Sequence, residues 1–173
     1  MVWLLIRGAI AGFAATVPMT LVMLAMHRSL PREREMPLAP QEVTEGVAEV
    51  AGVEDAIPPP AFPPVEIAAH FGYGAAAGTI YQLLLGSRFL ARIAFGMTFG
   101  FAVWAGSYLG YIPALGIRRP AYEDPAERNL TMIAAHLAWG AALGMLASWA
   151  WERQTETAQT GDSRKRVADG DAS

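Results

Sequence analysis

The sequence contains no cysteine, and its charged residues are few and unevenly placed. The absence of cysteine excludes disulfides, thiolate nucleophiles and thiolate metal ligands. Charged residues make up 17% of the 173 residues, against roughly 25% in a soluble domain. The formal net charge of −3 provides no excess of positive charge, so we expect no nucleic-acid partner.

Four long segments lack Asp, Glu, Lys and Arg altogether: residues 8–26, 67–87, 93–117 and 129–151. The shortest has 19 residues, and at about 1.5 Å per residue it would span about 28 Å, close to the thickness of the hydrocarbon layer. Four such helices in a short soluble protein would leave almost no polar face for water.

The sequence therefore predicts an all-α integral membrane protein with a lipid bilayer around it. We expect a four-helix bundle in one domain over residues 1–151. Its helices are predicted at about 3–26, 64–87, 92–117 and 125–151.

One pattern, a histidine followed by an aromatic residue and two glycines, occurs twice with a constant offset of 66 residues (136 − 70 and 140 − 74). Its copies are His70-x-x-Tyr73-Gly74-x-x-x-Gly78 and His136-x-x-Trp139-Gly140-x-x-x-Gly144. Because the helices carrying the two copies would point the same way, we expect two helical hairpins related as a parallel internal repeat.

Glycines four residues apart also occur in the first and third predicted helices. Small residues at this spacing allow two membrane helices to approach closely. The predicted helix-packing residues are Gly8, Gly12, Gly74, Gly78, Gly96, Gly100, Gly140 and Gly144.

The connection over residues 27–63 contains one short amphipathic pattern. Pro40 suits the first position of a helix and Gly52 its end, which predicts a helix at 40–52 that lies on the membrane or over the bundle. The prolines after it predict a stiff polyproline approach to the second long helix. Asp124 is expected to cap the fourth helix, and the polar segment 152–173 is expected to be disordered.

Two histidines inside predicted membrane helices are the main candidates for chemistry. His70 lies one turn after Glu66, and Tyr73 lies one turn further on. The candidate ligand or proton site is therefore His70, His136, Glu66 and Tyr73. A metal site is the least favoured interpretation, and the structural alternative is that each imidazole bonds a backbone or hydroxyl group and sets the helix register.

No catalytic motif is found in the sequence. It has no phosphate-binding loop, no HExxH, no nucleophile elbow and no dinucleotide fingerprint. We therefore expect a protein that is not an enzyme and has no cofactor and no metal.

Three stretches resemble a known family. They are Gly8-x-x-x-Gly12 with Pro18-Met-Thr20, the proline-rich entry Pro37–Pro40, and His70-x-x-Tyr73-Gly74-x-x-x-Gly78-x-x-Tyr81. Over about residues 5–150 the chain resembles the YagU-like family of small bacterial inner-membrane proteins of unknown function. The resemblance implies a four-helix inner-membrane protein and supplies no activity.

The short predicted loop between the second and third helices carries Arg88 and Arg92 and no acidic residue. Under the positive-inside rule this predicts both termini in the cytoplasm. The expected function is a non-enzymatic scaffold or accessory subunit that assembles through its glycine faces with its own copies or another membrane protein. The alternative is a small transporter, channel subunit or proton-coupled carrier that uses His70 and His136.

Overall fold

The computed structural model describes residues 2–28, 37–85 and 92–147. Helices and turns account for this part of the chain, with no strand in it, so the all-α prediction is confirmed. The long helices are α1 (Val2–Arg28), α3 (Phe62–Leu85), the continuous α4, η4 and α5 (Arg92–Ala105, Gly106–Tyr111 and Ile112–Ala114), and a last helix over Ala126–Ala147.

Three of these helices, Val2–Arg28, Ile93–Ala114 and Ala126–Ala147, are long and apolar enough to cross a membrane. Helix α3 is also long enough, with 24 residues. Its sequence is less apolar, because His70, Gln82 and three glycines interrupt the apolar residues.

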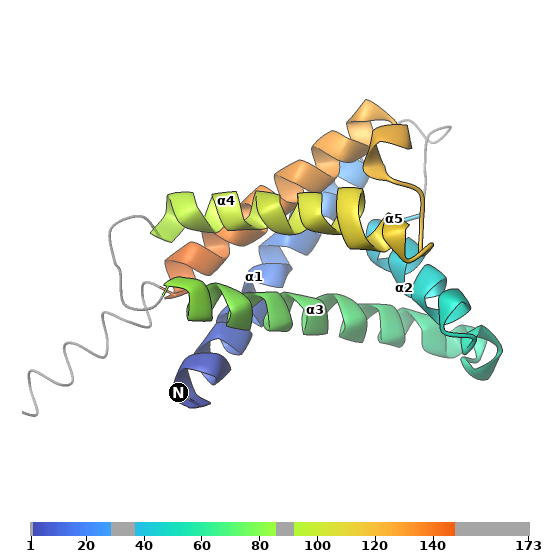
Figure 1. The fold of residues 1–173 in the computed structure, drawn as a ribbon, viewed down its shortest axis with the longest axis horizontal. Helices are drawn as coiled ribbons and strands as arrows, with labels where there is room; N and C mark the ends of the chain where they lie inside the picture. The colour runs from blue at the N-terminus through green and yellow to red at the C-terminus, as the bar shows by residue number, and fades with distance from the viewer. Residues whose placement is uncertain (1, 29–36, 86–91, 148–173) are drawn as a thin grey trace, which may run out of the picture.

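The long helices run alternately in opposite directions. Figure 1 shows α3 and α4 side by side, with α1 and the last helix crossing them obliquely. The start of α1, the end of α3, the start of α4 and the end of the last helix lie at one end of the molecule. The shorter helix α2 (Ala39–Val50) lies at the other end.

Helices α1 and α3 touch through their backbones at glycines. A methyl group on Gly8 would lie 2.7 Å from the carbonyl oxygen of Gly78, and one on Gly78 would lie 2.6 Å from the Cα of Gly12. A methyl group on Gly12 would collide with the carbonyl oxygen of Gly74. The two helices can therefore come this close only because no side chain separates them.

Helix α4 and the last helix make a similar contact. A methyl group on Gly96 would collide with the carbonyl oxygen of Gly140, and one on Gly140 would collide with that of Gly96. A methyl group on Gly100 would collide with the carbonyl oxygen of His136. The amide nitrogen of Gly144 would lie 3.2 Å from a methyl group on Gly96.

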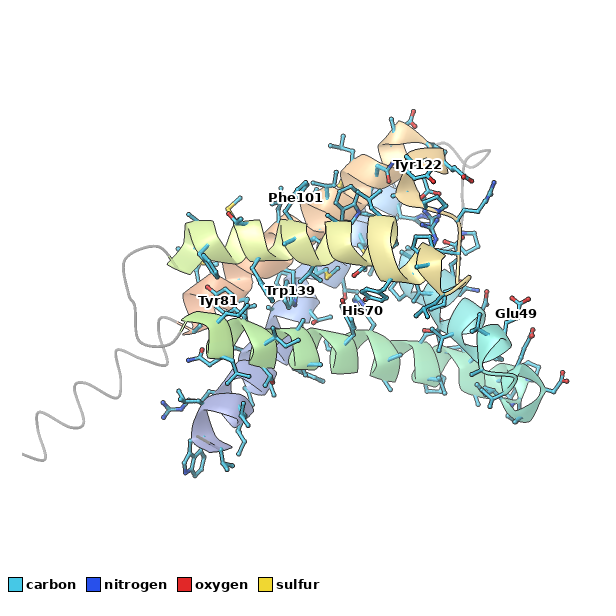
Figure 2. All side chains as sticks on the ribbon, in the orientation of Figure 1. Glu49, His70, Tyr81, Phe101, Tyr122 and Trp139 are labelled. Atoms are coloured by element: carbon cyan, nitrogen blue, oxygen red, sulfur yellow. The ribbon has the colours of Figure 1, made fainter. Side chains whose placement is uncertain are left out.

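Aromatic side chains fill the centre between these two helix pairs. The ring of Phe99 lies 5.3 Å from that of Tyr81 and 6.0 Å from that of Trp139. The indole N–H of Trp139 donates a hydrogen bond of 3.2 Å to the carbonyl of Gly12. Figure 2 shows Tyr81 and Trp139 pointing into the space between α3 and α4. This centre joins α1 and α3 to α4 and the last helix.

Two helices end earlier than predicted, for the same reason. Helix α2 ends at Val50, not at 52, and the third long helix ends at Ala114, not at 117. Gly52 and Gly116 have φ angles of 66° and 73°, which glycine adopts without steric cost. The amide of the residue after each glycine, Val53 or Ile117, donates a hydrogen bond to the carbonyl five residues before it. This is the Schellman arrangement that ends a helix.

Helix α3 begins at Phe62, two residues before its predicted start. The turn Pro59–Ala61 precedes it in place of the predicted polyproline segment. Pro63 fits the first turn because the first N–H groups of a helix have no partner within it. The predicted tail 152–173 and the predicted helix ends at 86–87 and 148–151 lie outside the described residues.

Replacement of Gly78 by alanine should destabilise the protein, because the added methyl group would meet backbone atoms of Gly8 and Gly12 that cannot rotate away. We expect the free energy of unfolding in detergent micelles to fall by about 1–3 kcal/mol. Gly72→Ala is the matched control, since a methyl group there meets nothing within 4 Å, and it should be neutral or stabilising by up to about 1 kcal/mol. Equal effects of the two variants would contradict the contact.

Candidate functional site: a cavity beneath helix α2

Helix α2 packs over one end of the helix assembly (Figure 1). Ala39 and Ala48 are buried, and Val43 packs against the core. A methyl group on Gly46 would collide with the carbonyl oxygen of Ile117, so the backbone of α2 rests directly on that of the segment after α5. Of the two predicted positions for this amphipathic helix, the structure shows the one over the bundle.

A cavity of about 410 Å³ lies between α2, α3, η4 and the last helix. This volume falls within the range of about 300–1,000 Å³ that is usual for small-molecule sites. Apart from Thr44, its polar wall residues are His70, Tyr73, Ser107, Tyr108, Tyr111 and His136. The remaining wall is apolar and includes Met19 and Met23 of α1.

The segment η4 (Gly106–Tyr111) is a stretch of π-helix inside the third long helix. A π-helical turn is wider than an α-helical turn, and such segments occur often at functional sites. Here it carries three of the polar wall residues, Ser107, Tyr108 and Tyr111. Glycine spacing suggested no such distortion, so the π-helical segment was not predicted from the sequence.

His70 of α3 is held by a hydroxyl group of α1. Its Nε2 lies 3.2 Å from the Thr20 hydroxyl, which itself donates to the carbonyl of Thr16 at 2.8 Å. Since the Thr20 proton is used in this way, Nε2 of His70 is the donor in their shared bond. In the neutral ring Nδ1 is then an unprotonated acceptor.

His136 of the last helix is held by its own backbone. Its Nδ1 lies 2.7 Å from the carbonyl of Met132 and must be the donor, because a carbonyl only accepts. The residue is 4% exposed, and no carboxylate of the described residues bonds to it. Because an unpaired buried charge is costly, we assign the neutral ring, with an unprotonated Nε2.

Three hydroxyl groups form a relay between α3 and η4. Tyr111 donates to Tyr73 at 2.8 Å, Tyr73 lies 3.1 Å from the Ser107 hydroxyl, and Ser107 donates to the carbonyl of Val103 at 2.6 Å. The Ser107 proton is therefore used, so Tyr73 is the donor to Ser107. The relay fixes Tyr73 against the π-helical segment.

The structure brings three of the four predicted site residues to one cavity: His70, Tyr73 and His136. Glu66 does not line this cavity, and no hydrogen bond or ion pair joins it to His70 among the described residues. Each histidine also has its own hydrogen bond, as the structural interpretation expects. Within residues 2–28, 37–85 and 92–147, no group of three or more His, Asp and Glu side chains could hold a metal ion.

A cluster of charges fastens α2 over the cavity. Glu42 of α2 pairs with Arg118 at 3.2 Å and also with Arg128 of the last helix. Asp124 was expected to cap that helix, but its carboxylate accepts two hydrogen bonds from Arg118, at 2.9 and 3.0 Å. Arg128 also donates to the carbonyl of Pro37, which precedes α2.

The Arg118 side chain is only 4% exposed. Burial by itself would lower the pKa of its guanidinium, but the hydrogen bonds to Asp124 and the charge of Glu42 raise that pKa above its usual value. The guanidinium lies 5.4 Å from the centre of the Tyr108 ring, within the range of a cation–π contact. Arg118 therefore connects the charged cluster to the cavity wall.

Comparison of the chain with protein-family models, with curated proteins and with solved structures found no match.

Removal of the Glu42 carboxylate should loosen α2. Glu42→Ala leaves Arg118 with one acidic partner, Asp124, and removes the hydrogen bond that Arg128 donates to Glu42. The Glu42 side chain is 36% exposed, so water weakens these contacts only in part. We therefore expect a loss of about 1–3 kcal/mol in local stability, the usual value for hydrogen bonds to charged groups. This corresponds to roughly 5- to 150-fold faster hydrogen exchange of the α2 amides.

Glu49→Ala on the same helix is the matched control, because Glu49 is exposed and points away from the other helices (Figure 2). Unchanged exchange in Glu42→Ala, or the same increase in both variants, would show that the cluster does not fasten α2.

Proposed function

We propose that this protein is a non-enzymatic integral membrane protein whose cavity binds a long-chain molecule taken up from the lipid bilayer. The observation that carries the proposal is the cavity of about 410 Å³ with a mostly apolar wall under α2. Its few polar wall groups are positioned by hydrogen bonds, as in sites that orient a ligand.

The outward faces of the helices support a membrane location. Large apolar side chains are exposed on several of them, among them Ile10, Phe13, Ile80 and Phe101. Contiguous apolar surface of this kind is unusual on a soluble monomer. We propose that α3 crosses the bilayer together with the three more apolar helices, since it pairs with α1 along its length.

We further propose that the bundle consists of two related hairpins. The contact of Gly12 with the carbonyl of Gly74 and with Gly78 has the same form as the contact of Gly96 with the carbonyl of Gly140 and with Gly144, at offsets of 84 (96 − 12) and 66 (140 − 74). This correspondence supports the internal repeat. Membership of the YagU-like family and location in a bacterial inner membrane stay predictions.

The cavity opens at the side of the molecule. Val47 of α2 and Val53 line it and are exposed, which leaves an opening beside α2. Val65, Tyr73 and Tyr111 also line it and are exposed, so a mouth also lies between α3 and η4. If both helices cross the bilayer, this mouth faces the lipid, and a ligand with an apolar chain can enter without passing through water.

The glycine faces favour binding over assembly as the function. Gly8, Gly12, Gly74, Gly78, Gly96, Gly100 and Gly140 all contact other helices of the same chain. These seven glycines hold the helices of one chain together, so none of them is available for contact with a partner protein. Assembly with a second copy or another protein stays a prediction, as does transport through the pair His70 and His136.

A large side chain at Ala69 should block the cavity. Both Ala69 and its neighbour Ala68 are exposed, but only Ala69 lines the cavity. We expect Ala69→Trp to reduce photolabelling by a diazirine-bearing dodecyl methyl ether about tenfold, which corresponds to about 1.4 kcal/mol of binding free energy. Labelling is measured by mass spectrometry on protein in lipid nanodiscs. The matched control Ala68→Trp should label like the wild type, and labelling of Ala69→Trp at the wild-type level would refute the proposed site.

The orientation can be tested directly because the chain has no cysteine of its own. If both termini face the cytoplasm, a membrane-impermeant maleimide added to intact bacterial spheroplasts should label Glu49→Cys. Ser163→Cys should be labelled only after the membrane is permeabilised. The reverse pattern would invert the proposed topology.

A further inference from the structure

One polar atom of the cavity wall, Nε2 of His136, is a hydrogen-bond acceptor with no partner in the described part of the chain. His136 lines the cavity and is 4% exposed. Its Nδ1 is occupied by the carbonyl of Met132. Nε2 lies on the opposite side of the ring. Among the described residues, the fully buried side-chain atoms without a hydrogen-bond partner belong to Trp104, Arg118 and Arg128. Nε2 of His136 is not one of them, so it is open to the cavity.

A buried acceptor without a hydrogen-bond partner lowers the stability of the folded protein, because its lost contact with water is not replaced. Two other polar groups of the cavity wall, Tyr73 and Ser107, have partners, since they are joined in the hydroxyl relay. The ring of Tyr108 meets His136 edge-on with 6.1 Å between their centres. Tyr108 lines the same cavity, and its hydroxyl has no hydrogen-bond partner among the described residues.

We infer that the bound molecule carries an uncharged hydroxyl group at its inner end, which donates a hydrogen bond to Nε2 of His136. The inference rests on the proposed function, namely that the cavity binds a long-chain molecule. An alcohol oxygen can both donate to this imidazole and accept from the phenol of Tyr108. The apolar chain then extends past Ala69 and Val65 to the mouth between α3 and η4.

A charged head group fits this end of the cavity poorly. The cationic side chains near it, Arg118 and Arg128, are already paired with Glu42 and Asp124 and do not line the cavity. A carboxylate placed against the acceptor Nε2 would meet a lone pair, and a buried charge without a partner is costly. The ligand class is therefore a long-chain alcohol or another lipid with a free hydroxyl group.

The test compares two competitors with the same chain, 1-dodecanol and its methyl ether, in which a methyl group replaces the hydroxyl hydrogen and removes the donor. Each competes with the diazirine-bearing dodecyl methyl ether for wild-type protein in nanodiscs, and concentrations are corrected for partition into the bilayer. We expect the alcohol to bind about 5- to 10-fold more tightly, as one buried hydrogen bond allows.

His136→Asn then separates the role of Nε2 from that of Nδ1. The asparagine amide can still donate to the carbonyl of Met132, but it places no acceptor at the position of Nε2. The preference for the alcohol over the methyl ether, measured as the ratio of their affinities for the same variant, should fall to about one. His136→Gln, which restores a polar group near the position of Nε2, should recover part of the preference.

Equal binding of alcohol and ether to the wild type would overturn this inference and leave the proposed binding function intact. A preference that persists in folded His136→Asn would overturn the assignment to His136. If the ether probe does not label the cavity at all, the proposed function fails as well. Since the first comparison uses the wild type alone, it holds even if the variants do not fold.

Discussion

The fold depends on direct contact between helix backbones at glycine. Gly12 shows this most clearly, because it faces both Gly74 and Gly78 of α3 and its carbonyl accepts the hydrogen bond from the Trp139 indole. A side chain on any of these glycines would separate the helices. At such short distances dispersion forces act between whole backbones, which is the main attraction between helices where water is absent. The aromatic centre and the walls of the cavity take their positions from these contacts.

The cavity exists because two features prevent the helices from closing at one end. The π-helical turn at η4 moves Ser107, Tyr108 and Tyr111 relative to a regular helix, and α2 covers the space rather than filling it. The cover is held by the charges of Glu42, Arg118 and Arg128 at the edge of the apolar region. The charged groups that hold α2 thus lie outside the cavity, while the cavity wall is mostly apolar, an arrangement that suits an apolar ligand.

The candidate site was predictable only in part. His70, Tyr73 and His136 stood out because polar groups inside apolar helices are costly and often functional, and all three line the cavity. Ser107 and the pairing of Glu42 with Arg118 were not predictable, because they join residues 34 and 76 positions apart in the chain. Local spacing describes neighbours on one helix and carries no information about which helices meet.

The all-α class and the approximate extent of each long helix could be predicted from the residues alone, because a continuous run of about 20 apolar residues without charge suits a helix, which satisfies its own backbone hydrogen bonds in apolar surroundings. The sequence also identified the glycines through which helices approach. The exact helix ends, Val50 and Ala114, depend on the positive φ angles of Gly52 and Gly116, which follow them. The position of α2 over the bundle and the cavity shared by two histidines could not be read from local sequence, because both follow from the way helices distant in sequence pack against each other.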